Sequence, residues 1–149
     1  MPLLVSLFFI AMLSLGMALH VPQQEAQLTT AVASAAATSV LAYREGLVDY
    51  LNANPSFVGT VADADFTPIW GANRDPAWTN VVVSGGTLYV YESAVSTTPL
   101  FLDVLYEKTN KSFLVGRNAA GVLVSATGFS TGITVPAAVP NGAITIVGK

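Results

Sequence analysis

The sequence predicts an α+β protein in which an N-terminal apolar helix precedes a long amphipathic helix packed on an antiparallel β-sheet. Three observations support this fold class. Residues 3–19 carry no charge, residues 22–53 place apolar side chains at helical spacing, and the chain beyond residue 80 alternates short apolar runs with glycine turns. Strands gathered after one long helix are typical of a domain whose helix lies across one sheet face. We therefore divide the chain into an apolar segment, residues 1–21, and one α+β domain, residues 22–149.

The composition excludes several classes of protein. Of the 149 residues, 52% are hydrophobic and only 10% are charged, whereas soluble globular domains carry roughly 25% charged residues. The net charge of −3 provides no basic stripe to neutralise phosphates, so nucleic acid is not expected as a partner. The absence of cysteine removes disulfides, thiolate nucleophiles and most zinc or iron–sulfur sites. The domain must therefore be stabilised by packing alone.

The apolar segment, residues 3–19, is expected to lie in lipid or in a translocation channel. As a helix its 17 residues span about 26 Å, at the short edge of what a hydrocarbon core of about 30 Å accepts. We predict a retained anchor in the bacterial inner membrane, with the soluble domain in the periplasm. The alternative is a secretory signal cleaved near Ala18, which ends a small-x-small pattern that begins at Gly16, although no Lys or Arg precedes the segment.

A pilin-like start, in which the apolar helix packs into a filament, is a further alternative. Pilins usually carry an acidic residue near the beginning of that helix, whereas Val5 and its neighbours are uncharged. Pro22 is compatible with a pilin-style kink, but a proline that opens a new helix explains it equally well. A wholly buried core helix would need protein on every side, and the rest of the chain is too small to provide it.

The amphipathic helix, residues 22–53, is the strongest local prediction. It should end near residue 53, because Asn54 precedes a proline. Small side chains at residues 31–37 allow another element to approach the helix closely. That element is either the domain's own sheet or a helix of another chain, and a homo-oligomer is therefore possible. The side chains expected on the buried face are Leu28, Val32, Ala36, Val40, Tyr43, Leu47 and Leu51.

The remaining segments are expected to form the sheet. Residues 81–83 and 88–91 predict two antiparallel strands around a glycine turn, with Leu88 and Val90 on one face and Tyr89 and Tyr91 on the other. Residues 100–108 fit either a short helix or a strand. Residues 125–138 are expected to form exposed loops, since they are rich in Ser, Thr, Gly and Ala and Pro136 disfavours a central strand. Further strands are predicted at residues 57–61, 113–116, 122–126 and 143–147.

Side chains suited to catalysis are sparse. The one histidine, His20, lies at the edge of the apolar segment and cysteine is absent, so a Ser-His-Asp arrangement is not expected and a Cys-His arrangement cannot form. Asp63 and Asp65 could bind a hard cation, but the other ligands of a calcium loop are missing, and we interpret them as solvated loop acids. The glycines at 85 and 86 lie between two strands and serve a turn. We therefore predict no catalytic residues, no cofactor and no metal, and a protein that is not an enzyme.

Two alternatives to that reading remain. A glycosidase needs only two carboxylates, which nine acids could supply, so a secreted cell-wall hydrolase is the enzymatic alternative. Trp70 and Trp78 bracket a polar loop that could present aromatic anchors to a protein or a glycan. We favour the interpretation that both tryptophans fold inward.

The overall layout resembles the PilM-type small protein of the type IVB thin-pilus systems of conjugative plasmids. The likeness covers nearly the whole chain, including the Ala/Ser/Thr/Gln-rich helix, residues 114–118 (LVGRN) and residues 140–144 (PNGAI). This resemblance implies a non-enzymatic role in thin-pilus biogenesis that supports conjugation, with other pilus-assembly proteins as partners. Contacts would be made through the helix face or an exposed sheet edge. A minor pilin-like filament subunit is the alternative role, and the family supplies no active-site residues.

Overall fold

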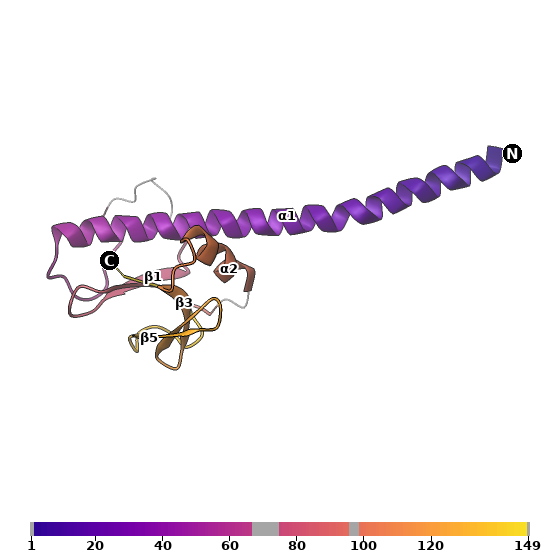
Figure 1. Cartoon of the computed structure of the whole chain (residues 1–149). Helices are drawn as coiled ribbons and strands as arrows, with labels where there is room; N and C mark the ends of the chain where they lie inside the picture. Colours follow the sequence, from indigo (N-terminus) through magenta and orange to yellow (C-terminus); the bar gives the residue numbers. More distant parts are fainter. Residues whose placement is uncertain (1, 67–74, 96–98, 149) are drawn as a thin grey trace.

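The computed structural model describes residues 2–66, 75–95 and 99–148, with side chains described from residue 25 onward. Within these residues the chain forms an α+β fold in which a long helix lies along one face of an antiparallel sheet (Figure 1), which confirms the predicted α+β class and the predicted packing of a helix on an antiparallel sheet. The elements, in chain order, are α1 (Pro2–Ala53), β1 (Trp78–Val82), β2 (Leu88–Glu92), α2 (Pro99–Lys108), β3 (Val115–Ala119), β4 (Val122–Ser125), β5 (Ser130–Thr134) and β6 (Ile144–Val147).

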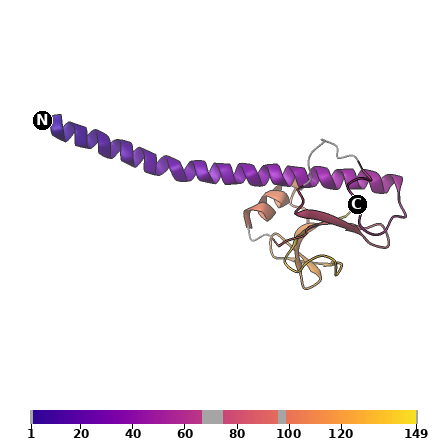
Figure 2. The same cartoon turned by 180° about the vertical axis from the view of Figure 1, so that it is seen from behind.

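Helix α1 is one continuous helix of 52 residues, and its N-terminal half projects beyond the rest of the domain in both views (Figures 1 and 2). The prediction of a new helix at Pro22 is wrong, because α1 continues through it. A proline inside a helix removes one backbone hydrogen bond and crowds the carbonyl four residues earlier, and α1 is nevertheless continuous from Pro2 to Ala53. The predicted anchor, residues 3–19, lies outside the described side chains. Among the residues that are described, no helix is both long and apolar enough to cross a bilayer.

The buried face of α1 carries the predicted apolar repeat over its C-terminal half. Val40, Leu47 and Leu51 are at most 3% exposed, and the helix ends at Ala53 as predicted. The prediction fails at Leu28 and Val32, which are 67% and 62% exposed. Leu28 and Val32 are exposed because α1 extends past the body of the domain at this end (Figure 1). Ala33 is the first described residue of α1 that belongs to the core.

The sheet has six strands in the order β1-β2-β6-β3-β4-β5, and every neighbouring pair is antiparallel. The β1–β2 hairpin is confirmed, although β1 begins earlier than expected, at Trp78. Leu88 and Val90 join the core cluster that includes α1, whereas Tyr89 and Tyr91 belong to a second cluster. The predicted placement of these two pairs on opposite faces is confirmed, and both faces of β2 are buried.

The second cluster closes the sheet face opposite α1. Leu123 and Val135 belong to it together with the β2 tyrosines, so the chain around β4 and β5 curls over this face. The Tyr89 hydroxyl donates to the carbonyl of Thr134 at 3.0 Å, and burial raises the pKa of this hydroxyl. Two core layers thus hold the sheet, and the layer between sheet and α1 is the larger.

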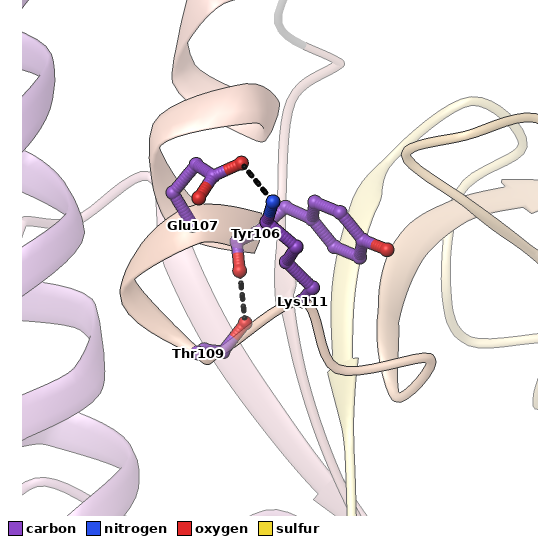
Figure 3. Close-up of polar contacts among 4 residues, drawn as sticks. All are labelled: Tyr106, Glu107, Thr109 and Lys111. Carbon is purple, nitrogen blue, oxygen red and sulfur yellow. Dashed lines mark hydrogen bonds and ion pairs between the residues drawn. The ribbon is translucent and has the colours of Figure 1, made fainter.

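Residues 100–108, whose sequence fits either a short helix or a strand, form helix α2, and Leu102 and Leu105 of this helix are buried. Its last turn is closed by Thr109, whose hydroxyl donates to the Tyr106 carbonyl at 3.0 Å, and by an ion pair between Lys111 and Glu107 at 3.5 Å (Figure 3). The helix therefore ends in a fixed turn before β3.

Several predicted strands require correction. The strand expected at residues 113–116 begins at Val115, and Phe113 is exposed. Residues 57–61 form no strand but a single bridge between Gly59 and Val82. The final strand is confirmed over Ile144–Val147.

Strand β5 was missed, because residues 125–138 were predicted to be loops. Its pairing with β4 contains a register shift, Gly132 has a φ of 73°, and the Thr131 hydroxyl bonds to the carbonyl of Leu123 at 2.8 Å. A bulge of this kind disrupts the two-residue alternation that identifies strands in a sequence.

Candidate interaction site

An open apolar groove of about 530 Å³ lies between α1, the first turn of α2 and the ends of β1 and β2. We call it the α1–α2 groove. Five of its lining residues come from α1, and the others come from the β1–β2 region and the start of α2. The lining residues are Leu28, Thr29, Val32, Ala33, Ala36, Asp75, Ala77, Trp78, Glu92, Ala94, Leu100 and Phe101.

The α1 wall of the groove combines large exposed side chains with small ones. Leu28 and Val32, one helical turn apart, are the two side chains that periodicity wrongly placed in the core. Full burial of a Val or Leu side chain contributes roughly 1.5–3 kcal/mol. The small side chain of Ala36 beside them, which is partly exposed, leaves room for another element to approach the helix. The described wall is thus an apolar surface that a binding partner could cover.

The base of the groove is rigid. Trp78 is 3% exposed, and its ring contacts that of Phe101 from α2 with a centroid distance of 5.6 Å. Asp75 fixes the chain before β1, since its side chain accepts from the backbone N–H of Ala77 at 2.9 Å and its carbonyl from that of Trp78 at 3.0 Å. The inward position predicted for Trp78 is confirmed, whereas Trp70 lies outside the described residues.

A carboxylate that the sequence analysis did not single out also lines the groove. Glu92 is only 6% exposed, and its Oε2 accepts from the backbone N–H of Ile144 at 3.3 Å. It follows Leu88 and Val90 on the face of β2 that is turned toward α1. An acid at the next inward position of an alternating strand was the signal that could have identified it.

Acidic side chains also surround the groove. Asp75 lines it, Glu25 precedes Leu28 by three residues on α1, and Asp103 follows Leu100 by three residues on α2; all three acids are exposed. Residues three apart share one side of a helix. The groove therefore has an apolar surface with an acidic rim, formed by these three exposed acids.

The described basic residues lie elsewhere, since none of Arg44, Lys108, Lys111 and Arg117 lines the groove. Figure 3 shows Lys111 beyond the C-terminal end of α2, whereas the groove is at the first turn of that helix. Arg44 lines a separate cavity of about 260 Å³, where its Nη2 donates to the carbonyl of Gly148 at 3.0 Å. We interpret this hydrogen bond as a structural contact that connects α1 to the residue after β6.

Among the described residues, both edges of the sheet are partly covered or bulged. At β1, Gly59 and Val82 exchange backbone hydrogen bonds at 2.9 and 2.8 Å, and the Asn80 side chain bonds both backbone groups of Val61. At β5, the N–H of Ile133 bonds to the Thr131 hydroxyl at 3.2 Å within the bulge. Covered and bulged edges disfavour strand addition, so the helix face is the better contact surface.

The other side chains considered in the sequence are not brought together. Asp63 and Asp65 are exposed in the loop after α1. Across residues 25–66, 75–95 and 99–148, no three histidine or acidic side chains gather to hold a metal ion. The side chain of His20 lies outside the described part of the chain.

The fold and the groove together define a class: a small antiparallel-sheet domain carried on a long helix, with a contact surface where the helix leaves the sheet. A model of the PilM family matches residues 8–147, and the chain therefore belongs to the PilM family. The resemblance inferred from the sequence is confirmed.

Two solved structures are similar to this chain. One is a crystal structure named as PilM from Escherichia coli B7A, with a TM-score of 0.59, 23% identity, and coverage of 80% of this chain and 93% of that chain. It supports the fold. The other is named as a PilM protein from Pseudomonas aeruginosa 2192, with a TM-score of 0.45, 27% identity, and coverage of 78% and 95%. No curated protein matches the chain.

Proposed function

We propose that this chain is a non-enzymatic component of type IV thin-pilus biogenesis that supports conjugation through protein–protein contacts in the periplasm. Membership of the PilM family supports the link to pili. The observation that carries the mode of action is the α1–α2 groove, in which Leu28 and Val32 are left largely exposed beside a rigid base. An exposed apolar surface with a polar rim is typical of a protein interaction site.

The chemistry of the groove favours contact over catalysis. Most of its lining is alkyl or aromatic, and burial of such surface stabilises a complex without any bond being broken. Of its two carboxylates, Glu92 already accepts a backbone hydrogen bond, and Asp75 holds the turn before β1.

The proposed location follows from the apolar segment. With residues 3–19 in the inner membrane, the 12 residues 20–31 of α1 lie between the segment and Val32, and the rise along the helix from residue 19 to Val32 is about 20 Å. The groove would then face the space just outside the bilayer, within reach of membrane-bound pilus-assembly proteins.

A minor pilin-like filament subunit is the second candidate, and one observation favours it. Helix α1 is continuous and its N-terminal half projects from the domain (Figures 1 and 2), so that half could pack among neighbouring subunits. Co-sedimentation with sheared pili would support the subunit. Recovery with an intact Met1 in the membrane fraction would support the anchored component, and cleavage after Ala18 would support a free periplasmic protein.

Val32→Glu is expected to reduce thin-pilus number and conjugative transfer at least about tenfold in a deletion strain complemented with the variant. The substitution places a charge on the apolar wall, where burial under a partner is costly, and about 1.4 kcal/mol of lost affinity is a tenfold change. The measurement is pilus counting by electron microscopy together with mating frequency.

Val58→Glu is the matched control. Val58 is 59% exposed, close to the 62% of Val32, and lies beyond the C-terminal end of α1, away from the groove. It should retain normal pili at equal protein abundance. A Val32→Glu strain as fully piliated as the control would overturn the proposed contact surface.

A further inference from the structure

We propose that the α1–α2 groove binds an apolar helix flanked by Lys or Arg, supplied by a different protein of the pilus machinery. This inference rests on the proposed function and specifies the partner by its chemistry. Two properties of the groove carry it: the shape of the α1 wall and the charge of the rim.

The α1 wall fits a helix. The small, partly exposed side chain of Ala36 allows a second helix to approach closely, and interaxial distances fall to about 8 Å when the contact side chains are small. Leu28 and Val32, one turn apart, supply apolar contacts for side chains spaced by three or four residues on the bound helix. An extended strand would need a free sheet edge, and the described edges are covered or bulged.

The rim determines the charge of the partner. The exposed acids Glu25, Asp75 and Asp103 lie in or beside the groove, and the described basic residues do not line it. Exposed ion pairs contribute only about 0.2–1 kcal/mol each, so the apolar contacts supply most of the affinity. The acids select the partner, because an acidic helix would face like charges on several sides.

A second copy of this chain does not have the required chemistry. Two copies joined groove to groove across a two-fold axis would bring the same acids face to face. The chain's own apolar segment, residues 3–19, carries no Lys or Arg, and the first basic residue in the sequence is Arg44. Lys108 and Lys111 follow the apolar helix α2, but Leu102 and Leu105 of that helix are buried in the chain's own core. We therefore assign the basic flanks to another protein.

The test measures binding of the full chain, in a nonionic detergent, to two fluorescein-labelled synthetic helices by fluorescence anisotropy. Both helices have about 18 residues, enough for measurable helicity, and share one Leu/Ala face; one carries Lys on its polar face and the other carries Glu. The Lys helix is expected to bind at least about tenfold more tightly. Val32→Glu should weaken it by a similar factor, and Val58→Glu should not.

A charge-reversal pair tests the rim separately. Glu25→Lys combined with Asp103→Lys should remove most of the preference for the Lys helix. The control, Glu45→Lys combined with Asp49→Lys, makes the same charge change at two exposed α1 positions that do not line the groove, and it should keep the preference. Equal effects of the two pairs would overturn the inference, because they would indicate an attraction due to net charge alone.

Failure of this inference is distinguishable from failure of the proposed function. If the two helices bind equally while Val32→Glu abolishes pili, the pilus function stands and the predicted partner is wrong. If deletion of the protein leaves pili and mating unchanged, the pilus function is wrong whatever the peptides show.

Discussion

Replacing Asn80 with alanine is expected to lower the free energy of unfolding by about 3 kcal/mol. Asn80 is fully buried and makes three side-chain hydrogen bonds. Its Oδ1 accepts from the N–H of Val61 at 2.9 Å, and its Nδ2 donates to the Val61 carbonyl at 3.0 Å and to the Tyr43 hydroxyl at 2.7 Å. Each buried backbone group left without a partner costs roughly 1–3 kcal/mol, and the substitution leaves both groups of Val61 in that state.

This side chain joins three separate parts of the fold: helix α1, the loop after it and edge strand β1. The measurement is urea unfolding followed by circular dichroism. Asn52→Ala, at an exposed position in the last turn of α1, is the control and should change stability by no more than about 0.5 kcal/mol. If both variants unfold at the same urea concentration, Asn80 does not join these elements as described.

Gly116→Ala is expected to destabilise the domain by at least about 3 kcal/mol, near the upper end of what overpacking costs. Gly116 lies in β3 between β4 and β6. A Cβ at this position would overlap the backbone carbonyl of Val124 in β4. The backbone of a paired strand cannot change conformation to avoid this overlap, as a flexible side chain could. The two strands would have to separate locally, with loss of the hydrogen bonds between them.

The matched control is Gly121→Ala in the turn between β3 and β4. Gly121 has a φ of 86° but open space around its Cα, so alanine there should cost only the left-handed conformation, about 1–2 kcal/mol. Thermal unfolding of both variants gives the comparison. A Gly116→Ala variant as stable as Gly121→Ala would mean that β3 and β4 do not approach each other so closely.

The sequence predicts those elements whose pattern is local and regular. The repeat through Val40, Leu47 and Leu51 identifies the buried face of α1, and the alternation of Leu88 with Tyr89 identifies a strand covered on both sides. Periodicity gives the side of a helix but not the point at which the rest of the domain ends. For this reason Val32 was assigned to the core, although it is exposed.

The candidate site could not be predicted because it depends on contacts between distant segments. Trp78 and Phe101 meet through the packing of α2 on β1, and both approach Val32 only because α1 lies across the sheet. Strand β5 was missed for a related reason, since a side-chain hydrogen bond from Thr131 replaces part of its backbone pairing. The family resemblance carried the functional prediction that residue patterns alone could not provide.

Site-specific photo-crosslinking in living cells tests most directly whether the α1–α2 groove is the surface that binds the partner protein. A photoreactive amino acid is introduced at position 32 and, separately, at position 58, in cells with and without the other pilus genes. We expect an adduct at position 32 only when those genes are present, mapped by mass spectrometry to an apolar helix flanked by Lys or Arg, and none at position 58. Normal piliation without an adduct at position 32, or the same adduct at both positions, would contradict the account.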